Sequence, residues 1–109
     1  MSSQLLIIDV VSRIVIKHYI FYMSMISIDI KTIPHSPGVY LFRNKSVILY
    51  AGKASDLKNR LASYFRSRIS EKVRTLREEA TSLEIITLAS EIEALIKEAE
   101  LIKRHIPKF

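Results

Sequence analysis

The sequence contains no cysteine, and only two of its 109 residues are glycine. The absence of cysteine excludes disulfide bonds, zinc fingers and thiol catalysis. Average glycine usage near 7% would give roughly eight glycines in a chain of this length, so glycine is strongly depleted. The two that remain, Gly38 and Gly52, lie two residues outside a pair of tyrosines, Tyr40 and Tyr50. This symmetry makes residues 36–53 the first candidate for a site.

The sequence also lacks a long uninterrupted apolar run. Residues 4–28 are strongly apolar but are interrupted by Asp9, Arg13, Lys17 and His18. A membrane span needs about 20 apolar residues with few charges, and no basic start or small-residue cleavage site indicates a signal peptide. We therefore expect a cytoplasmic protein without stable membrane insertion. We expect residues 1–24 to be an apolar extension of unknown role and residues 25–109 to form one domain.

Positive charge exceeds negative charge, and the formal net charge is +6. Residues 53–77 hold eight basic side chains against two acids, whereas residues 78–100 hold seven acids against one lysine. The eight are Lys53, Lys58, Arg60, Arg66, Arg68, Lys72, Arg74 and Arg77. Such a block predicts a surface for a polyanion on one side of the domain. Two solvated helix faces of opposite sign are the alternative interpretation.

The pattern of apolar residues predicts a small α+β domain, with a three-stranded antiparallel sheet and helices packed on it. Residues 39–43 and 47–51 are strand-like and flank a three-residue turn at 44–46, and residues 83–88 form the third strand. Apolar and polar residues alternate over 26–31, which predicts a short strand-like or extended segment leading into the domain. Helices are expected to begin near Asp56, capped by Ser55, near Ser70 or Glu71, and at Ser90.

The last helix begins with a predicted capping box, in which Ser90 and Glu93 bond each other's backbone groups. Its buried stripe is expected to comprise Ile92, Leu95, Ile96, Ala99 and Ile102. Glu98 differs from the other carboxylates, because its contacting positions are apolar and its own helix offers no basic partner. Such a group needs a metal ion or a cation from another element, and a half-buried structural glutamate is the simpler interpretation.

The predicted turn places Tyr40 directly opposite Tyr50, and Gly38 opposite Gly52, all on one face of the hairpin. The two phenols then converge beside bare backbone that a ligand can approach closely. An aromatic cross-strand pair with glycines at the strand ends is the alternative interpretation.

The following helix adds Arg60 and Tyr64, four residues apart, and Lys53 directly follows the second glycine. We expect these groups to converge with the tyrosines where the hairpin meets the helix. Guanidinium, ammonium and hydroxyl groups together suit a phosphate.

The linked series of motifs resembles the GIY-YIG nuclease family, most closely the amino-terminal nuclease domain of the bacterial excinuclease UvrC. The resemblance runs from Ile33 to Phe109, through Gly38-Val39-Tyr40, Tyr50-Ala51-Gly52, Lys53-Ala54-x-x-Leu57-x-x-Arg60-Leu61-x-x-Tyr64-Phe65 and Ser90-Glu91-Ile92-Glu93-Ala94-Leu95. It implies the GIY-YIG endonuclease fold and a metal-dependent phosphodiesterase that nicks DNA in nucleotide excision repair or related processing. DNA and other excision-repair proteins are the implied partners.

The resemblance also implies roles for individual residues. Glu98 would be the protein ligand of one Mg²⁺ or Mn²⁺, and Arg60 would hold the scissile phosphate. Either Tyr40 or Tyr50 would position or deprotonate the attacking water. Lys53 would help that tyrosine to position or deprotonate the water, and Tyr64 would complete the pocket. The basic residues expected to contact DNA are Lys58, Arg66, Arg68 and Lys72.

The family pattern continues past Phe109 to an asparagine, so we expect the chain as given to have reduced activity. A DNA-binding module with an incomplete metal site is one alternative function. An interaction domain that docks a partner through residues 4–28 is another.

Overall fold

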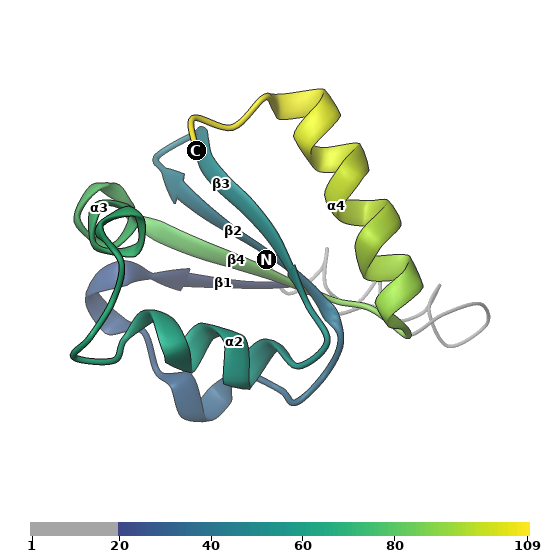
Figure 1. The fold of residues 1–109 in the computed structure, drawn as a ribbon, viewed down its shortest axis with the longest axis horizontal. Helices are drawn as coiled ribbons and strands as arrows, with labels where there is room; N and C mark the ends of the chain where they lie inside the picture. The colour runs from purple at the N-terminus through teal and green to yellow at the C-terminus, as the bar shows by residue number, and fades with distance from the viewer. Residues whose placement is uncertain (1–19) are drawn as a thin grey trace.

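The computed structural model describes residues 20–109, which form a four-stranded antiparallel sheet with helices on both faces (Figure 1). The strands are β1 (Ile20–Ser24), β2 (Gly38–Asn44), β3 (Val47–Ala54) and β4 (Ser82–Thr87). The helices are α2 (Leu57–Tyr64), α3 (Glu71–Glu79) and α4 (Glu91–His105). The strand order is β1-β4-β2-β3, which makes β3 an edge strand. The predicted α+β class is confirmed, with four strands in place of three.

The additional strand, β1, comes from the segment that we expected to be an extension. β1 pairs with β4 from Ile20↔Ile86 to Ser24↔Ser82, so residues 20–24 are part of the sheet. The predicted extended lead-in is wrong, because Met25–Ser27 and Ile30–Thr32 form short 3-10 helices. Each helix is capped by the residue before it, whose side chain accepts a backbone N–H. These caps favour short helices more strongly than the alternation of apolar and polar residues at 26–31 favours a strand. Residues 1–19 lie outside the described residues.

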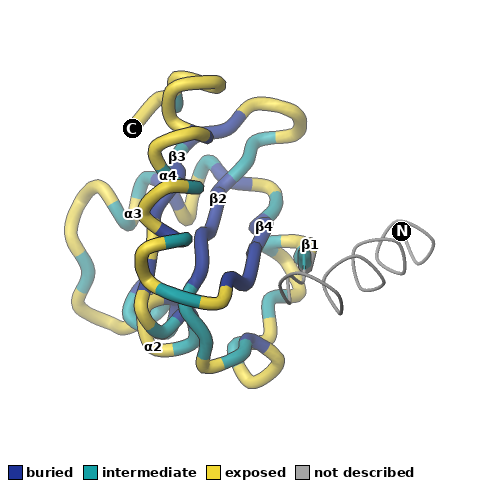
Figure 2. The backbone as a smooth tube through the Cα atoms, turned by 90° about the vertical axis from the view of Figure 1, so that its right-hand side faces the viewer, coloured by how far each residue is buried: buried dark blue, intermediate teal, exposed yellow. Residues whose placement is uncertain are grey.

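Alternation of side chains along the strands divides the core into two layers. One layer packs under α2 and α3 and includes Tyr40, Phe42, Leu57, Leu61, Tyr64, Leu76, Leu83 and Ile85. The other packs under α4 and includes Val39, Leu41, Ile48, Ala51, Ile86, Leu88, Ala94 and Leu101. Figure 2 shows the buried residues concentrated along β2 and β4, whereas α4 is largely exposed. The odd-numbered residues of β2 therefore face α4, and the even-numbered ones face α2.

The helix starts are close to the predicted ones. Ser70 caps α3 as expected, but α2 is capped by Asp56, whose carboxylate accepts the Asn59 N–H at 3.0 Å, and not by Ser55. Serine and aspartate cap equally well, so two adjacent candidates cannot be separated by residue type. At α4, Ser90 accepts the Glu93 N–H as predicted, but the Glu93 carboxylate accepts the N–H of Ala89, 2.8 Å away.

Helix α4 buries a different stripe from the one predicted. Ile92 is 71% exposed, Leu95 51%, Ile96 62% and Ile102 42%, and Ala99 is exposed as well. The buried residues are Ala94 and Leu101, and Glu98 between them is half-buried. Helix α4 packs chiefly over β2 and β3, so its contact with the sheet is narrow, and the periodicity of its apolar residues does not decide which of two adjacent stripes is buried. As a result, Glu98 lies on the packed side of the helix.

The hairpin between β2 and β3 has a shifted register. Its turn has two residues, Lys45 and Ser46, and Lys45 adopts a left-handed backbone with φ 55°. A bulge follows, so the opposed pairs are Gly38↔Ala54, Tyr40↔Gly52 and Phe42↔Tyr50. The predicted direct pairing of Tyr40 with Tyr50 is therefore wrong. The shift is even, however, so both tyrosines stay on the face toward α2.

The two glycines are explained by close packing on that face. A Cβ at Gly52 would overlap the ring and hydroxyl of Tyr40, and one at Gly38 would overlap the carbonyl of Ile86 and the side chain of Leu57. Neither glycine has a positive φ. The glycines therefore make room for neighbouring residues of the core, and the space beside Gly52 belongs to Tyr40.

Replacing Gly52 by alanine is expected to destabilise the domain. Alanine normally stabilises a strand relative to glycine by about 0.5–1 kcal/mol, but here the new methyl group meets a ring that is 1% exposed and cannot move aside. Overpacking of this kind costs about 1–3 kcal/mol. Urea unfolding measures the change, with Val47→Ala on the same strand as a control expected to stay within about 0.5 kcal/mol. An unchanged midpoint for Gly52→Ala would contradict this packing.

Candidate active site

Three tyrosines gather on the sheet face that α2 covers. Tyr40 on β2 is the centre of the cluster. Its ring centroid lies 6.1 Å from that of Tyr50 on β3 and 5.6 Å from that of Tyr64 on α2. The hydroxyls of Tyr40 and Tyr64 share a hydrogen bond of 2.9 Å. The structure thus brings together three of the residues singled out in the sequence, from three different elements.

The three phenols differ in burial, and this separates their chemistry. Tyr40 is 1% exposed and Tyr64 is 7% exposed, whereas Tyr50 is half-buried. Burial, followed by the hydrogen bond to Tyr64, raises the pKa of Tyr40 far above its usual value. Burial also raises the pKa of Tyr64. Both hydroxyls are therefore held protonated, and of the three side chains Tyr50 is the one that solvent reaches.

The raised pKa of Tyr40 predicts a loss of stability in alkali. The folded state favours the protonated phenol, so its contribution is complete below the unfolded pKa, near 10, and is lost as the pH rises above that value. In Tyr40→Phe the free energy of unfolding should fall less steeply between about pH 9 and pH 11. Urea unfolding across this range measures the slope, and Tyr22→Phe, at a residue 50% exposed, should change it less. Equal slopes for Tyr40→Phe and the wild type would contradict the burial of this hydroxyl.

Arg60 brings a cation to the cluster from one helical turn before Tyr64. Its guanidinium is close enough to oppose, electrostatically, the upward pKa shifts of Tyr40 and Tyr64. Arg60 is exposed and forms no ion pair with any residue in the range 20–109. It also lines a hollow of about 340 Å³ at the start of α2, together with Ala54, Ser55, Asp56, Asn59 and Ser63. An unpaired guanidinium beside phenol hydroxyls suits a phosphate oxygen.

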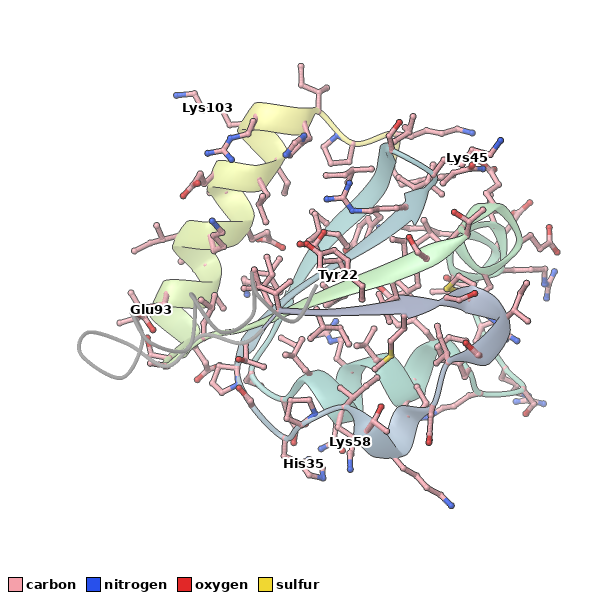
Figure 3. All side chains as sticks on the ribbon, turned by 180° about the vertical axis from the view of Figure 1, so that it is seen from behind. Tyr22, His35, Lys45, Lys58, Glu93 and Lys103 are labelled. Carbon is pink, nitrogen blue, oxygen red and sulfur yellow. The ribbon has the colours of Figure 1, made fainter. Side chains whose placement is uncertain are left out.

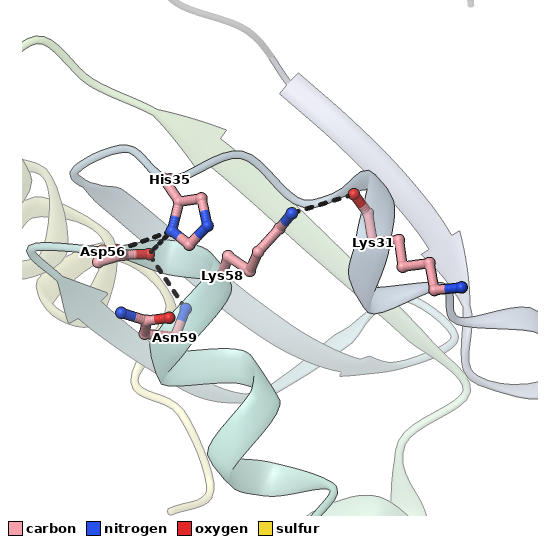
Figure 4. A network of polar contacts seen from close by, with 5 residues as sticks. All are labelled: Lys31, His35, Asp56, Lys58 and Asn59. Carbon is pink, nitrogen blue, oxygen red and sulfur yellow. Dashed lines mark hydrogen bonds and ion pairs between the residues drawn. The ribbon is translucent and has the colours of Figure 1, made fainter.

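A polar network that the sequence did not predict fixes the start of α2 beside this hollow (Figure 4). Nδ1 of His35 lies 2.8 Å and 3.1 Å from the two carboxylate oxygens of Asp56, which also cap the helix. The Asn59 N–H first, and then His35, lower the pKa of Asp56. Lys58 is engaged here too, since its Nζ donates to the carbonyl of Lys31 at 3.2 Å. The sequence could have indicated only one part of this network, the helix cap at Asp56. The contact with His35 has no local sequence signal, because the two residues are 21 positions apart.

Lys53 and Glu98 belong to the other side of the sheet. Lys53 follows Gly52 on edge strand β3 and pairs with Val39, so alternation turns its side chain toward the face that α4 covers. Glu98 lies on the packed side of α4, between Ala94 and Leu101. Within residues 20–109 neither side chain forms a hydrogen bond or an ion pair. The expected convergence of Lys53 with the tyrosines is therefore wrong, because the tyrosines lie on the face toward α2 and alternation places Lys53 and Glu98 on the face toward α4.

The four residues predicted to contact DNA occupy two regions. Lys58 lies beside His35 at the start of α2, where Figure 3 labels both, away from Glu93 and Lys103 on α4. Arg66 and Arg68 are exposed after the end of α2. Lys72 lies on α3, with its ammonium 4.1 Å from the centroid of the Tyr50 ring. A basic surface thus extends from α2 to α3 beside the tyrosine cluster.

The family model for the UvrC-like GIY-YIG domain matches residues 36–109, which include all three tyrosines, Arg60 and Glu98. The chain belongs to this family. In the curated relatives named UvrABC system protein C, the identity is 45% for Carboxydothermus hydrogenoformans and 51% for Thermotoga maritima. These matches cover 73% and 70% of the chain but 14% of each relative, so the chain spans about one-seventh of their length.

A solved structure also resembles this GIY-YIG domain closely. The N-terminal endonuclease domain of UvrC from Thermotoga maritima, in a crystal structure with its catalytic magnesium, matches with a TM-score of 0.69 and 51% identity. The match covers 72% of this chain and 88% of that one. The same domain has been solved as an asparagine-to-alanine mutant and as three tyrosine-to-phenylalanine mutants, each with the divalent cation bound.

None of the helices formed by residues 20–109 combines the length and the apolar character that a membrane-spanning helix needs.

Proposed function

We propose that this chain is a divalent-metal-dependent endonuclease domain that hydrolyses one phosphodiester bond of DNA in nucleotide excision repair. The observation that carries the proposal is the cluster of three phenols beside an unpaired arginine, in a member of the UvrC-like GIY-YIG family. The Thermotoga maritima relative is an endonuclease domain with a catalytic magnesium. DNA is the proposed substrate, and other excision-repair proteins are the proposed partners.

The spacing of the tyrosines supports their assignment to the site. The tyrosines replaced in the three Thermotoga maritima mutants are separated by ten and fourteen residues. Tyr40, Tyr50 and Tyr64 have the same separations. We infer that the three phenols of this chain correspond to those three.

Burial divides the proposed work among the phenols. Tyr50, the half-buried member, positions or deprotonates the attacking water, because the other two hydroxyls are buried and kept protonated. Tyr40 and Tyr64 hold the site in shape through their shared hydrogen bond. Arg60 binds the scissile phosphate with its forked donors and offsets the charge that develops there.

The donor set fits a magnesium ion that keeps much of its water. Within residues 20–109 no three His, Asp or Glu side chains gather as they would in an all-protein metal site. Glu98, half-buried and unpaired, supplies the single carboxylate that we propose as a ligand of Mg²⁺ or Mn²⁺. Mg²⁺ is commonly held by one or two carboxylates together with waters and phosphate oxygens. When bound, the ion lowers the pKa of a coordinated water and stabilises charge on the phosphate.

The edge position of β3 explains how groups on both faces of the sheet can share one substrate. Among residues 20–109 no strand flanks β3 on its outer side, and the backbone N–H of Phe109 donates to the Leu49 carbonyl, so a DNA strand can lie along the edge from Tyr50 to Ala54. Tyr50 would meet the DNA from the face toward α2, and Lys53 and Glu98 from the face toward α4. We propose that the scissile phosphate lies at this edge, level with Tyr50 and Lys53.

Nicking of supercoiled plasmid by the purified chain tests the proposed function. We expect conversion to the open circle with Mg²⁺ and none with EDTA. A parallel reaction with Mn²⁺ tests whether Mn²⁺ also supports nicking. Salt-dependent binding of DNA without nicking would replace the proposal with a non-catalytic binding module, and failure to bind DNA at low salt would reject both.

A further inference from the structure

A second hollow, of about 410 Å³, lies where α2 is joined to α3. It is lined by Arg66, Ser67, Ile69, Arg74, Arg77 and Glu78. Three guanidinium groups and a single carboxylate therefore border one small space. Arg74 and Arg77 belong to the basic block predicted to form a polyanion surface, but only Arg66 of these three arginines was named among the expected DNA contacts.

Within residues 20–109 the arginines of this hollow have no anionic partner, a property they share with Arg60. Arg43, Arg104 and Lys108 are each ion-paired, to Glu84, Glu100 and Glu79 respectively. In contrast, Arg66 and Arg74 form neither an ion pair nor a hydrogen bond through their side chains with any residue in the range 20–109. Like charges gathered around one space repel each other unless an anion joins them, and the guanidinium fork matches the oxygens of a phosphate.

Two cation–π contacts from α3, which carries Arg74 and Arg77 of the hollow, reach the tyrosine cluster and the residue next to it. Lys72, on the first turn of α3, places its ammonium 4.1 Å from the centroid of the Tyr50 ring. Arg77, on the last turn, lies 5.1 Å from the centroid of Phe65, which directly follows Tyr64. Helix α3 thus contacts the cluster through Lys72 and the residue after Tyr64 through Arg77, and Figure 1 shows it beyond the end of α2, on the same side of the sheet. A DNA strand that passes Tyr50 can continue over α3 without crossing the sheet.

We propose that this hollow binds a backbone phosphate of the DNA strand on one side of the scissile phosphate. The contact is independent of base sequence, because phosphate oxygens are the same at every step. It fixes the direction in which the strand runs over the domain, from the edge of β3 toward α3. The inference rests on the proposed function, since the anion is taken to belong to the DNA that is cleaved.

The salt dependence of DNA binding tests this contact. Affinity for duplex DNA is measured by fluorescence anisotropy in EDTA, so that no cleavage occurs, at several salt concentrations. Each phosphate contact contributes about 0.9 to the slope of log K against log salt. We expect Arg66→Ala/Arg74→Ala to make this negative slope less steep, by about 0.9, which corresponds to one phosphate contact. The control, Lys103→Ala/Arg104→Ala on α4, removes the same charge and should leave the slope unchanged.

Ethylation of single phosphates locates the contact. On a duplex short enough to admit one binding register, ethylation of one phosphate outside the scissile bond should weaken binding by the wild type, and the Arg66→Ala/Arg74→Ala variant should be insensitive at that phosphate. A wild-type slope in this variant, or an equal fall in the control, overturns the proposal even if the wild type nicks DNA. If the wild type binds with the expected slope difference but does not nick, the proposed function fails and the phosphate site stands. Absence of DNA binding rejects both.

Discussion

Arg60→Ala is expected to lower the rate of nicking about 100-fold to 1,000-fold at saturating DNA. The guanidinium is exposed, has no ion-pair partner among residues 20–109 and lies beside two buried phenols, so it can bind the phosphate on which charge develops. Removing one preorganised donor to such a charge typically has an effect of this size. Single-turnover nicking of supercoiled plasmid with Mg²⁺ measures it. Arg60→Lys should recover part of the rate at most, because a lysine keeps the charge but loses the fork.

Arg104→Ala is the matched control for this substitution. Arg104 is also an exposed helical arginine, but it pairs with Glu100 on the outer side of α4. Its loss should leave the nicking rate within about twofold, since surface ion pairs contribute less than about 1 kcal/mol to stability. Equal rates for Arg60→Ala and Arg104→Ala would remove Arg60 from the site.

Glu98→Gln is expected to lower nicking at least about 100-fold and to raise the Mg²⁺ concentration needed for half-maximal rate. Glutamine keeps the shape of the side chain but removes the negative charge that we propose as the metal ligand. Because Glu98 has no partner within residues 20–109, this change breaks no ion pair, and stability should be nearly unchanged. Nicking rates over a series of Mg²⁺ concentrations, with a thermal melt of each protein, separate the two effects.

Glu91→Gln provides the comparison for that experiment. Glu91 is an exposed carboxylate in the first turn of the same helix, about two turns before Glu98. This variant should show the wild-type dependence on Mg²⁺. The assignment of Glu98 would be rejected if Glu98→Gln also kept that dependence, or if it lost activity because it melted well below the wild type.

Local signals in the sequence predicted the elements well. The hairpin, the starts of α3 and α4, and the common face of Tyr40 and Tyr50 follow from β-branched runs, capping residues and alternation. Alternation explains why Tyr40 and Tyr50 share a face although the predicted register was wrong. A shift of two residues moves the opposed pairs but leaves each side chain on its face.

The wrong predictions concern contacts that no local pattern encodes. The hairpin turn has two residues in place of three, and a bulge between Phe42 and Arg43 shifts the pairing of the strands beyond it. At α4 two adjacent stripes are apolar, and the narrow contact with β2 and β3 decides which one is buried. The role of Gly52 likewise depends on where the ring of Tyr40 lies in three dimensions.

Paramagnetic broadening by Mn²⁺ in nuclear magnetic resonance spectra tests most directly whether Glu98 and the tyrosine cluster serve one metal at the edge of β3. Mn²⁺ is added in small amounts to labelled protein, in which it broadens amide signals close to the site it occupies. We predict that signals around Glu98 in α4 and around Tyr50 and Lys53 in β3 weaken together, and that Glu98→Gln abolishes both effects. Broadening that spares β3, or that persists unchanged in Glu98→Gln, would contradict a shared metal site.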